Sequence, residues 1–179
     1  MSNKSGSTPG TLRLLASVFF LFSLVTVLGA AQSVRDHLTE QETEAVRLNQ
    51  ELDKRTGVFI KAADRRLLVL TDPTGAAAKI SKKDLELYGP LPTGTRAQLL
   101  TDLAGILDEA ADKIDDVAER DEANPLLMKS LKKLAEAAAR YLPQLKAIGD
   151  AAKDRDEITA ASRAADSAQV IVDAAKRHG

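Results

Sequence analysis

Apolar residues in the second half of the chain recur at alternating intervals of three and four, which is the spacing of one face of an α-helix. Three successive segments carry this pattern and predict helices over residues 97–120, 125–148 and 151–177. The apolar positions are Leu100, Leu103, Leu107, Ala110, Ile114 and Val117 in the first segment, Leu127, Leu131, Leu134, Ala138, Tyr141, Leu145 and Ile148 in the second, and Ile158, Ala161, Ala165, Ala168, Val172 and Ala175 in the third. Because the segments are similar in length and separated by short turns, they indicate an antiparallel helical bundle.

Turn-forming residues mark the boundaries between these helices. Asn124 is a suitable N-cap and Pro125 suits the first helical position, so the second helix should begin there. Gly149 and Asp150 predict the end of that helix and the N-cap of the next. The apolar register continues on both sides of Pro143, so we expect a kink at this proline and not an end.

Residues 33–70 are expected to supply the fourth helix of the bundle. Their apolar positions on one heptad grid are Val34, Leu38, Ala45, Leu48 and Leu52. The same grid places Gln41 and Arg55 on that face, so the first half should form a thin stalk. After Gly57 the apolar density rises. Two short strands at 58–60 and 67–70 are an alternative there, although alanine and charged residues between them favour a helix.

A long connection, residues 71–95, separates this helix from the next. It is bounded by Asp72-Pro73-Thr74-Gly75 on one side and by Gly89-Pro90 and Pro92-Thr93-Gly94 on the other. Within it, Ser81 to Asp84 resembles a capping box and predicts a short helix that ends at Tyr88. A connection of this length in a compact bundle is either a crossover or a functional loop.

Residues 14–31 form an uncharged apolar segment after a polar leader, residues 1–13. As a helix the segment would extend about 27 Å, close to the ~30 Å hydrocarbon core of a bilayer, so we expect a transmembrane anchor. The alternative is a signal peptide cleaved near Ala31, since Gly29-Ala30-Ala31 offers the small residues that cleavage needs.

Both interpretations of the apolar segment predict the same topology. Lys4 and Arg13 precede it and should keep the N-terminus cytoplasmic, which places residues 33–179 outside the cytoplasm. We therefore expect a single-pass protein of the inner membrane with a periplasmic or extracellular C-terminal domain, or a periplasmic protein after cleavage. The expected segments are a leader (1–13), a membrane segment (14–31), a stalk with the first bundle helix (32–70), a loop (71–95) and the remaining three helices (96–179).

The amino-acid composition limits the kinds of catalytic and binding site that the chain can form. The chain has no Cys and only 2 His among its 179 residues, which excludes disulfides and thiolate chemistry and leaves little room for histidine-based catalysis. Its net charge of −1 provides no general attraction to nucleic acid. We assign no catalytic, cofactor-binding or metal-ligating residue.

The clearest charged feature is an acidic helical face with Asp108, Asp112, Asp115 and Glu119 at spacings of three and four. Carboxylates in this arrangement can bind a divalent cation, but a solvated face is the more common outcome. Lys129, Lys132, Lys133 and Arg140 on the next predicted helix are expected to neutralise part of it.

Five other residues have a structural and a functional interpretation. His37 and His178 are expected to be solvated surface histidines. Arg65-Arg66 could meet anionic lipid head groups if the stalk lay flat, an idea to which interleaved acids give little support. Tyr88 is expected to pack the long connection onto the bundle or to contact a partner.

Together these features predict an all-α, non-enzymatic, membrane-tethered bundle that acts outside the cytoplasm as an interaction or scaffold module of the cell envelope. Its partner would be an envelope protein or a second copy of the chain, with no cofactor, nucleic acid or identifiable small molecule. One alternative is a ligand-sensing bundle with a separate signalling partner, which resembles the extracytoplasmic domains of bacterial chemoreceptors and sensor kinases in architecture only. The other is a carboxylate-based metal-binding protein.

Overall fold

The computed structural model describes residues 36–178, and every regular element in this range is a helix, as the apolar pattern predicts. The elements are α1 (Glu40–Leu48), α2 (Leu52–Thr71), the 3-10 helix η1 (Ala76–Lys79), α3 (Lys82–Tyr88), α4 (Arg96–Arg120), α5 (Leu126–Ala151) and α6 (Arg155–His178). The predicted leader and membrane segment, residues 1–31, lie outside the described residues. Among the helices of residues 36–178, none is both long and apolar enough to cross a bilayer.

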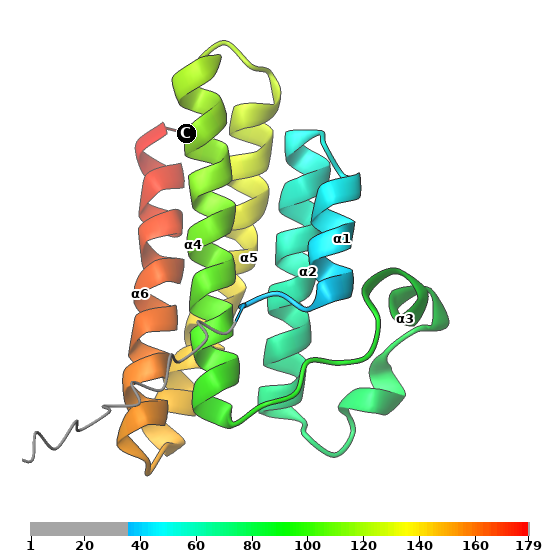
Figure 1. The fold of residues 1–179 in the computed structure, drawn as a ribbon. Coiled ribbons are helices and arrows are strands. Elements are labelled where there is room, and N and C mark those ends of the chain that lie inside the picture. The colour runs from blue at the N-terminus through cyan, green and yellow to red at the C-terminus, as the bar shows by residue number, and fades with distance from the viewer. Residues whose placement is uncertain (1–35, 179) are drawn as a thin grey trace, which may run out of the picture. The chain divides into compact units, whose positions relative to one another are not determined.

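Four long helices, α2, α4, α5 and α6, form the bundle (Figure 1). α4 and α5 lie at its centre, because each packs against both α2 and α6. α4, α5 and α6 are joined by short turns, and each runs antiparallel to the one before it. α1 lies beside α2, and α3 packs against α1 at the edge of the molecule.

The core between the long helices is built mainly from leucine, isoleucine and alanine. α4 is its main contributor, with Leu99, Leu100, Leu103, Ala104, Ile106, Leu107, Ala110 and Ile114 buried. Phe59 of α2 and Tyr141 of α5 are the buried aromatic residues of the described range, each 1% exposed. The Tyr141 hydroxyl donates to Oδ1 of Asp64 at 2.7 Å, which ties α5 to α2. Burial, followed by the neighbouring Asp64 carboxylate, raises the pKa of Tyr141, so the phenol stays protonated.

The region before the long connection contains two helices instead of the predicted one. α2 is continuous over 20 residues, so the alternative of two strands at 58–60 and 67–70 is wrong. The single helix predicted over 33–70 is wrong too, because α1 ends at Leu48 and the chain turns before α2. Arg55 stabilises this turn by donating to the carbonyl oxygens of Asn49 and Gln50, at 3.2 and 3.3 Å. α1 then packs along α2 with Ala45 buried, and Leu38, just before α1, is buried as well.

Several predicted helix boundaries are confirmed. The Ser81 hydroxyl accepts from the backbone N–H of Asp84 at 3.1 Å and caps α3, which ends at Tyr88. α5 begins at Leu126, one residue later than predicted, with Pro125 as its N-cap, and Asn124 Oδ1 accepts from the N–H of Leu126 at 3.0 Å. Pro143 lies inside α5 without ending it.

The boundary between α5 and α6 differs from its prediction. α5 continues through Gly149 and Asp150, so neither residue ends the helix or caps the next one. Asp154 takes the capping role instead, since its Oδ1 accepts from the N–H groups of Asp156 and Glu157 at 2.9 and 3.1 Å. An acceptor four residues further along the chain therefore shifts the start of α6 to Arg155.

α6 also presents a different face to the bundle from the one predicted. Ile158 is 46% exposed, whereas Ile171 is 2% exposed. The buried positions are Ala160, Ala161, Ala164, Ala168 and Ile171. Because α6 packs against both α4 and α5, its buried face is centred between these two neighbours, and the predicted apolar stripe lies partly to one side of it.

Replacing Ile171 with alanine should lower the free energy of unfolding by about 2–5 kcal/mol, because it removes enclosed atoms and leaves a cavity. Ile158→Ala removes the same atoms from the same helix at an exposed position and should change it by no more than about 1 kcal/mol. Denaturant unfolding of the full-length chain measures both. Equal losses in the two variants would contradict the assigned face of α6.

Candidate functional site

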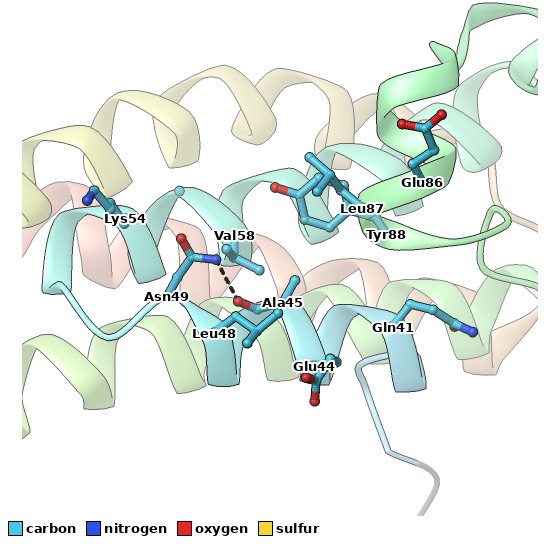
Figure 2. Close-up of a pocket in the computed structure, with 11 residues that line it drawn as sticks. Gln41, Glu44, Ala45, Leu48, Asn49, Lys54, Val58, Glu86, Leu87 and Tyr88 are labelled. Carbon is cyan, nitrogen blue, oxygen red and sulfur yellow. Dashed lines mark hydrogen bonds between the residues drawn. The ribbon is translucent and has the colours of Figure 1, made fainter.

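A groove lies between α1, the first half of α2, and α3 (Figure 2). Its volume is about 630 Å³, and it is open to solvent. The lining residues are Gln41, Glu44, Ala45 and Leu48 of α1, Asn49 of the following turn, Lys54, Gly57 and Val58 of α2, and Glu86, Leu87 and Tyr88 of α3. We call it the α1–α3 groove.

Two large apolar side chains on the walls of the groove are exposed. Leu48 of α1 is 70% exposed and Leu87 of α3 is 51% exposed. Val58 and Ala45, which also line the groove, are buried. Single exposed leucines are common on protein surfaces, but two that flank one hollow with apolar residues at its base form a surface suited to contact.

Leu48 departs from the pattern of its own segment. Leu38, Ala45 and Leu52 share its predicted heptad grid and are buried, but Leu48 is not. It is the last residue of α1, where the chain turns away towards α2, so no helix covers it. Tertiary packing therefore leaves a residue predicted for the core at the rim of the groove.

α3 forms its wall of the groove without contributing any buried residue. The Lys61 ammonium lies 3.0 Å from the Asp84 carboxylate and connects α2 to α3. This contact lowers the pKa of Asp84, mainly through the hydrogen bond from Lys61. Ala76 of η1, 2% exposed, is the apolar anchor of the preceding turn. The position of α3 thus depends mainly on polar contacts.

The strongest of these contacts come from a buried charged cluster of Glu42, Arg65 and Arg66. The three side chains are 0%, 1% and 1% exposed. Glu42 Oε1 accepts from Arg65 Nε at 3.1 Å and from Arg66 Nη1 at 2.7 Å. One carboxylate of α1 therefore holds two neighbouring guanidinium groups of α2.

Arg65 extends the cluster to the far end of α3. Its Nη2 donates to the carbonyl oxygens of Tyr88 at 3.2 Å and Gly89 at 2.9 Å, and to that of Pro90. The guanidinium also lies 5.9 Å from the centre of the Tyr88 ring. Gly89 has a φ of 68°, a conformation that glycine adopts without strain and that turns these carbonyls towards the arginine. Arg65 thus fixes the end of the α3 wall against α2.

Arg66 extends the cluster in the other direction, to the segment before α1. Its Nη2 donates to the His37 carbonyl oxygen at 2.6 Å, and its Nη1 also donates to that of Ala62 at 2.9 Å. The His37 ring in turn lies 2.7 Å from the Glu109 carboxylate of α4, measured from Nε2 to Oε2. The cluster therefore connects the chain before α1, α2 and the end of α3.

With two arginines and one glutamate, the cluster carries one net positive charge, and its three side chains are shielded from solvent. Burial lowers the pKa of Arg65, while Glu42 acts in the opposite direction. A buried ion pair adds little net stability, because removing its members from water costs about as much as their attraction returns. Removing one member is different, since it leaves a buried charge without its partner. The cluster therefore specifies one arrangement of α1, α2 and α3.

The predicted acidic face of α4 does not gather around a metal site. Asp108 lies 3.5 Å from Arg163 of α6, while Asp112, Asp115 and Glu119 are exposed. Within residues 36–178 no group of three or more histidine or carboxylate side chains is placed to hold a metal ion.

The basic residues of α5 were predicted to neutralise this acidic face, and for two of them that prediction is wrong. Lys129 pairs with the Asp53 carboxylate of α2, and Lys133 donates to the Asp53 carbonyl oxygen at 2.9 Å. This edge of α5 faces α2, so its lysines reach α2 and not the acids of α4.

The structure also changes the assignment of three predicted surface positions. Arg65 and Arg66 are buried, so they cannot meet lipid head groups. His37 is held between Arg66 and Glu109 with 32% of its side chain exposed, so it is not the freely solvated residue predicted. His178 is exposed at the end of α6, as predicted. Tyr88 joins α3 to Arg65, which agrees with its predicted packing role, and it also lines the groove, while a partner contact at Tyr88 stays a prediction.

Sequence reasoning missed the key role of Glu42, although a signal for it was present. Thr39 and Glu42 have the spacing of a capping box, and both of its hydrogen bonds form, from Glu42 N–H to Thr39 Oγ1 at 3.2 Å and from Thr39 N–H to Glu42 Oε2 at 3.0 Å. This pattern would have placed the start of α1. Nothing in the local sequence indicates that the same carboxylate also meets two arginines more than 20 residues away.

Replacing Glu42 with glutamine should lower the free energy of unfolding by about 3–5 kcal/mol, because two buried guanidinium groups lose their carboxylate. Glutamine keeps an oxygen that can accept from the Thr39 N–H. The lower free energy of unfolding would therefore come from the missing negative charge and not from a lost helix cap. Glu40→Gln is the matched control on the exposed side of α1, with an expected change of about 0.5 kcal/mol or less. Denaturant unfolding of both variants tests this, and equal effects would contradict it.

Comparison of the chain with protein-family models, with curated proteins and with solved structures finds no match. A proposal for its function rests on the α1–α3 groove, on the contacts that hold the groove and on the sequence.

Proposed function

We propose that this chain is a non-enzymatic interaction module of the cell envelope, tethered to the inner membrane through residues 14–31 with its helical bundle outside the cytoplasm. The observation that carries the proposal is the pair of exposed leucines, Leu48 and Leu87, on opposite walls of one groove. Burying both in a partner would remove apolar surface from water and contribute about 1.5–3 kcal/mol for each leucine fully covered.

The way the groove is held supports this proposal. Its walls belong to three helices, and the buried Glu42, Arg65 and Arg66 cluster joins them. A surface that is already fixed loses little conformational freedom when a partner binds, so more of the contact energy appears as affinity. Apolar side chains on a fixed support are typical of a binding surface.

The tether and the topology are supported by the sequence. Residues 14–31 carry no charge, and the two basic residues that precede them favour a cytoplasmic N-terminus. A tethered bundle is held near other envelope proteins, which raises its effective concentration towards a partner in the same membrane.

A ligand-sensing bundle is the second candidate. The volume of the α1–α3 groove lies in the range of about 300–1,000 Å³ that small-molecule sites occupy. However, its central amide is already engaged with a neighbour, since Asn49 Nδ2 donates to the Ala45 carbonyl oxygen at 2.7 Å. An open groove with two exposed leucines suits a protein surface better than a small polar molecule.

Photo-crosslinking in intact cells that express the chain tests the interaction. A photoreactive residue in place of Leu48 or Leu87 should give the same discrete crosslinked product from both positions. Val170 of α6 is the matched control, because it is 64% exposed and lies outside the groove. Products from Val170 equal to those from the groove, or no product from any position, would contradict the proposal.

The mass of the mature chain tests the tether. Retention of residues 1–31, together with recovery of the chain in the membrane fraction after alkaline extraction, is the expected result. A mass that begins near Gln32 would instead indicate cleavage after Ala31 and a periplasmic protein.

A further inference from the structure

The surface around the α1–α3 groove is acidic. A second hollow continues from the groove along α1, and it is lined by Asp36, Leu38, Glu40, Gln41, Thr43 and Glu44. The two hollows share Gln41 and Glu44, so they form one continuous surface. Together they present the carboxylates of Asp36, Glu40, Glu44 and Glu86, which we call the acidic rim.

Few exposed basic side chains of the described residues pair with this rim, and the rim residue Asp36 lies 4.0 Å from His37 Nδ1. Glu40 and Glu86 form no ion pair with any of residues 36–178. Glu44 pairs with Arg47, but both side chains are exposed, at 48% and 71%, and such pairs contribute only about 0–1 kcal/mol. Lys54 is the basic residue that lines the groove, and it already pairs with Glu51 at 2.9 Å. A cationic group placed over the rim would therefore find carboxylates that are free to meet it.

The groove also limits the backbone conformation of what it can hold. Its walls are helices, so they offer side chains and no sheet edge that could satisfy the hydrogen bonds of an extended partner strand. A helix satisfies its own backbone and needs only side-chain contacts. α1 has nine residues and is about 13 Å long, which matches two to three turns of a partner helix.

We propose that the α1–α3 groove binds a short, basic amphipathic helix of a partner protein. Apolar side chains on one face of that helix pack between Leu48 and Leu87, above Val58. Lysine or arginine side chains beside that face meet Glu44 and Glu86 on the two walls. The inference rests on the proposed function and adds the charge and the secondary structure of the partner.

The same observations disfavour the two other occupants of an apolar surface. An anionic bilayer would be repelled by the acidic rim, because the repulsion between like charges grows as they approach. A second copy of the chain would have to bring a basic amphipathic surface to the groove. The lysines of α5 that could supply one, such as Lys129 and Lys133, are engaged with Asp53 of α2. We therefore assign the partner helix to another protein, and a second copy is an outcome of the test below.

Two designed helical peptides of about 15 residues test the proposal. They share the same leucine positions at helical spacing, but one carries lysine and the other glutamate on the flanks. Fluorescence anisotropy measures the binding of each labelled peptide to the full-length chain, with every variant purified in the same detergent. The lysine peptide should bind at least about tenfold more tightly than the glutamate peptide, and its affinity should fall as salt is added.

Variants then assign this binding to the groove. Leu48→Asp should weaken binding of the lysine peptide at least about tenfold, and the double change Glu44→Lys with Glu86→Lys should reverse the preference between the two peptides. Val170→Asp adds the same charge at an exposed position outside the groove and should have no effect. All four positions are exposed, so an unchanged melting temperature checks that each variant folds.

Each result separates the alternatives. Equal binding of the two peptides, or equal binding of the lysine peptide to wild type and Leu48→Asp, would overturn the inference. Concentration-dependent dimers that Leu48→Asp abolishes would identify a second copy as the occupant and overturn it as well. If groove crosslinks form in cells but the lysine peptide does not bind, the proposed function stands and this partner chemistry is wrong. If neither occurs, the proposed function itself fails.

Discussion

The arrangement of the first three helices depends on one buried carboxylate. Glu42 of α1 binds Arg65 and Arg66 of α2, and all three side chains are 0–1% exposed. Arg65 also donates to carbonyl oxygens at the end of α3, and Arg66 donates to the carbonyl oxygen of His37 before α1. Hydrophobic burial alone would allow α1 and α3 to pack in several ways, because α1 is short and α3 buries no residue. The buried charges disfavour the alternative arrangements of α1 and α3, because each of them would leave a charge or a carbonyl oxygen without its partner.

This arrangement explains why exposed leucines are tolerated beside the groove. The four long helices bury a continuous core of their own, so stability does not require α1 and α3 to close over Leu48 and Leu87. The polar contacts from Arg65 and Lys61 hold α3 in place while its leucines stay in water. A surface held open in this way is the basis of the proposed interaction module, and the acidic rim is the basis of the proposed preference for a basic partner.

Local patterns in the sequence predicted much of the bundle. The apolar residues of α4 and of the second half of α5 lie in the core as their spacing indicated, and Ser81 caps α3 as its position indicated. Predictions were wrong where two local signals competed. Gly149-Asp150 has the composition of a helix end, but Asp154 provided the cap, and Ile158 fits the apolar spacing of α6 but lies outside the face between α4 and α5.

The sequence by itself determined the helical class, the approximate extent of α4, α5 and α6, and the chemistry that the absence of cysteine excludes. These are local properties, because helical periodicity and capping act over a few residues. Only the tertiary structure decided that Arg65 and Arg66 are buried with Glu42, that Leu48 leaves the core, and that α1 and α3 enclose a groove. Such contacts join residues more than 20 positions apart, and a charge pattern has the same local appearance whether it faces water or a buried partner.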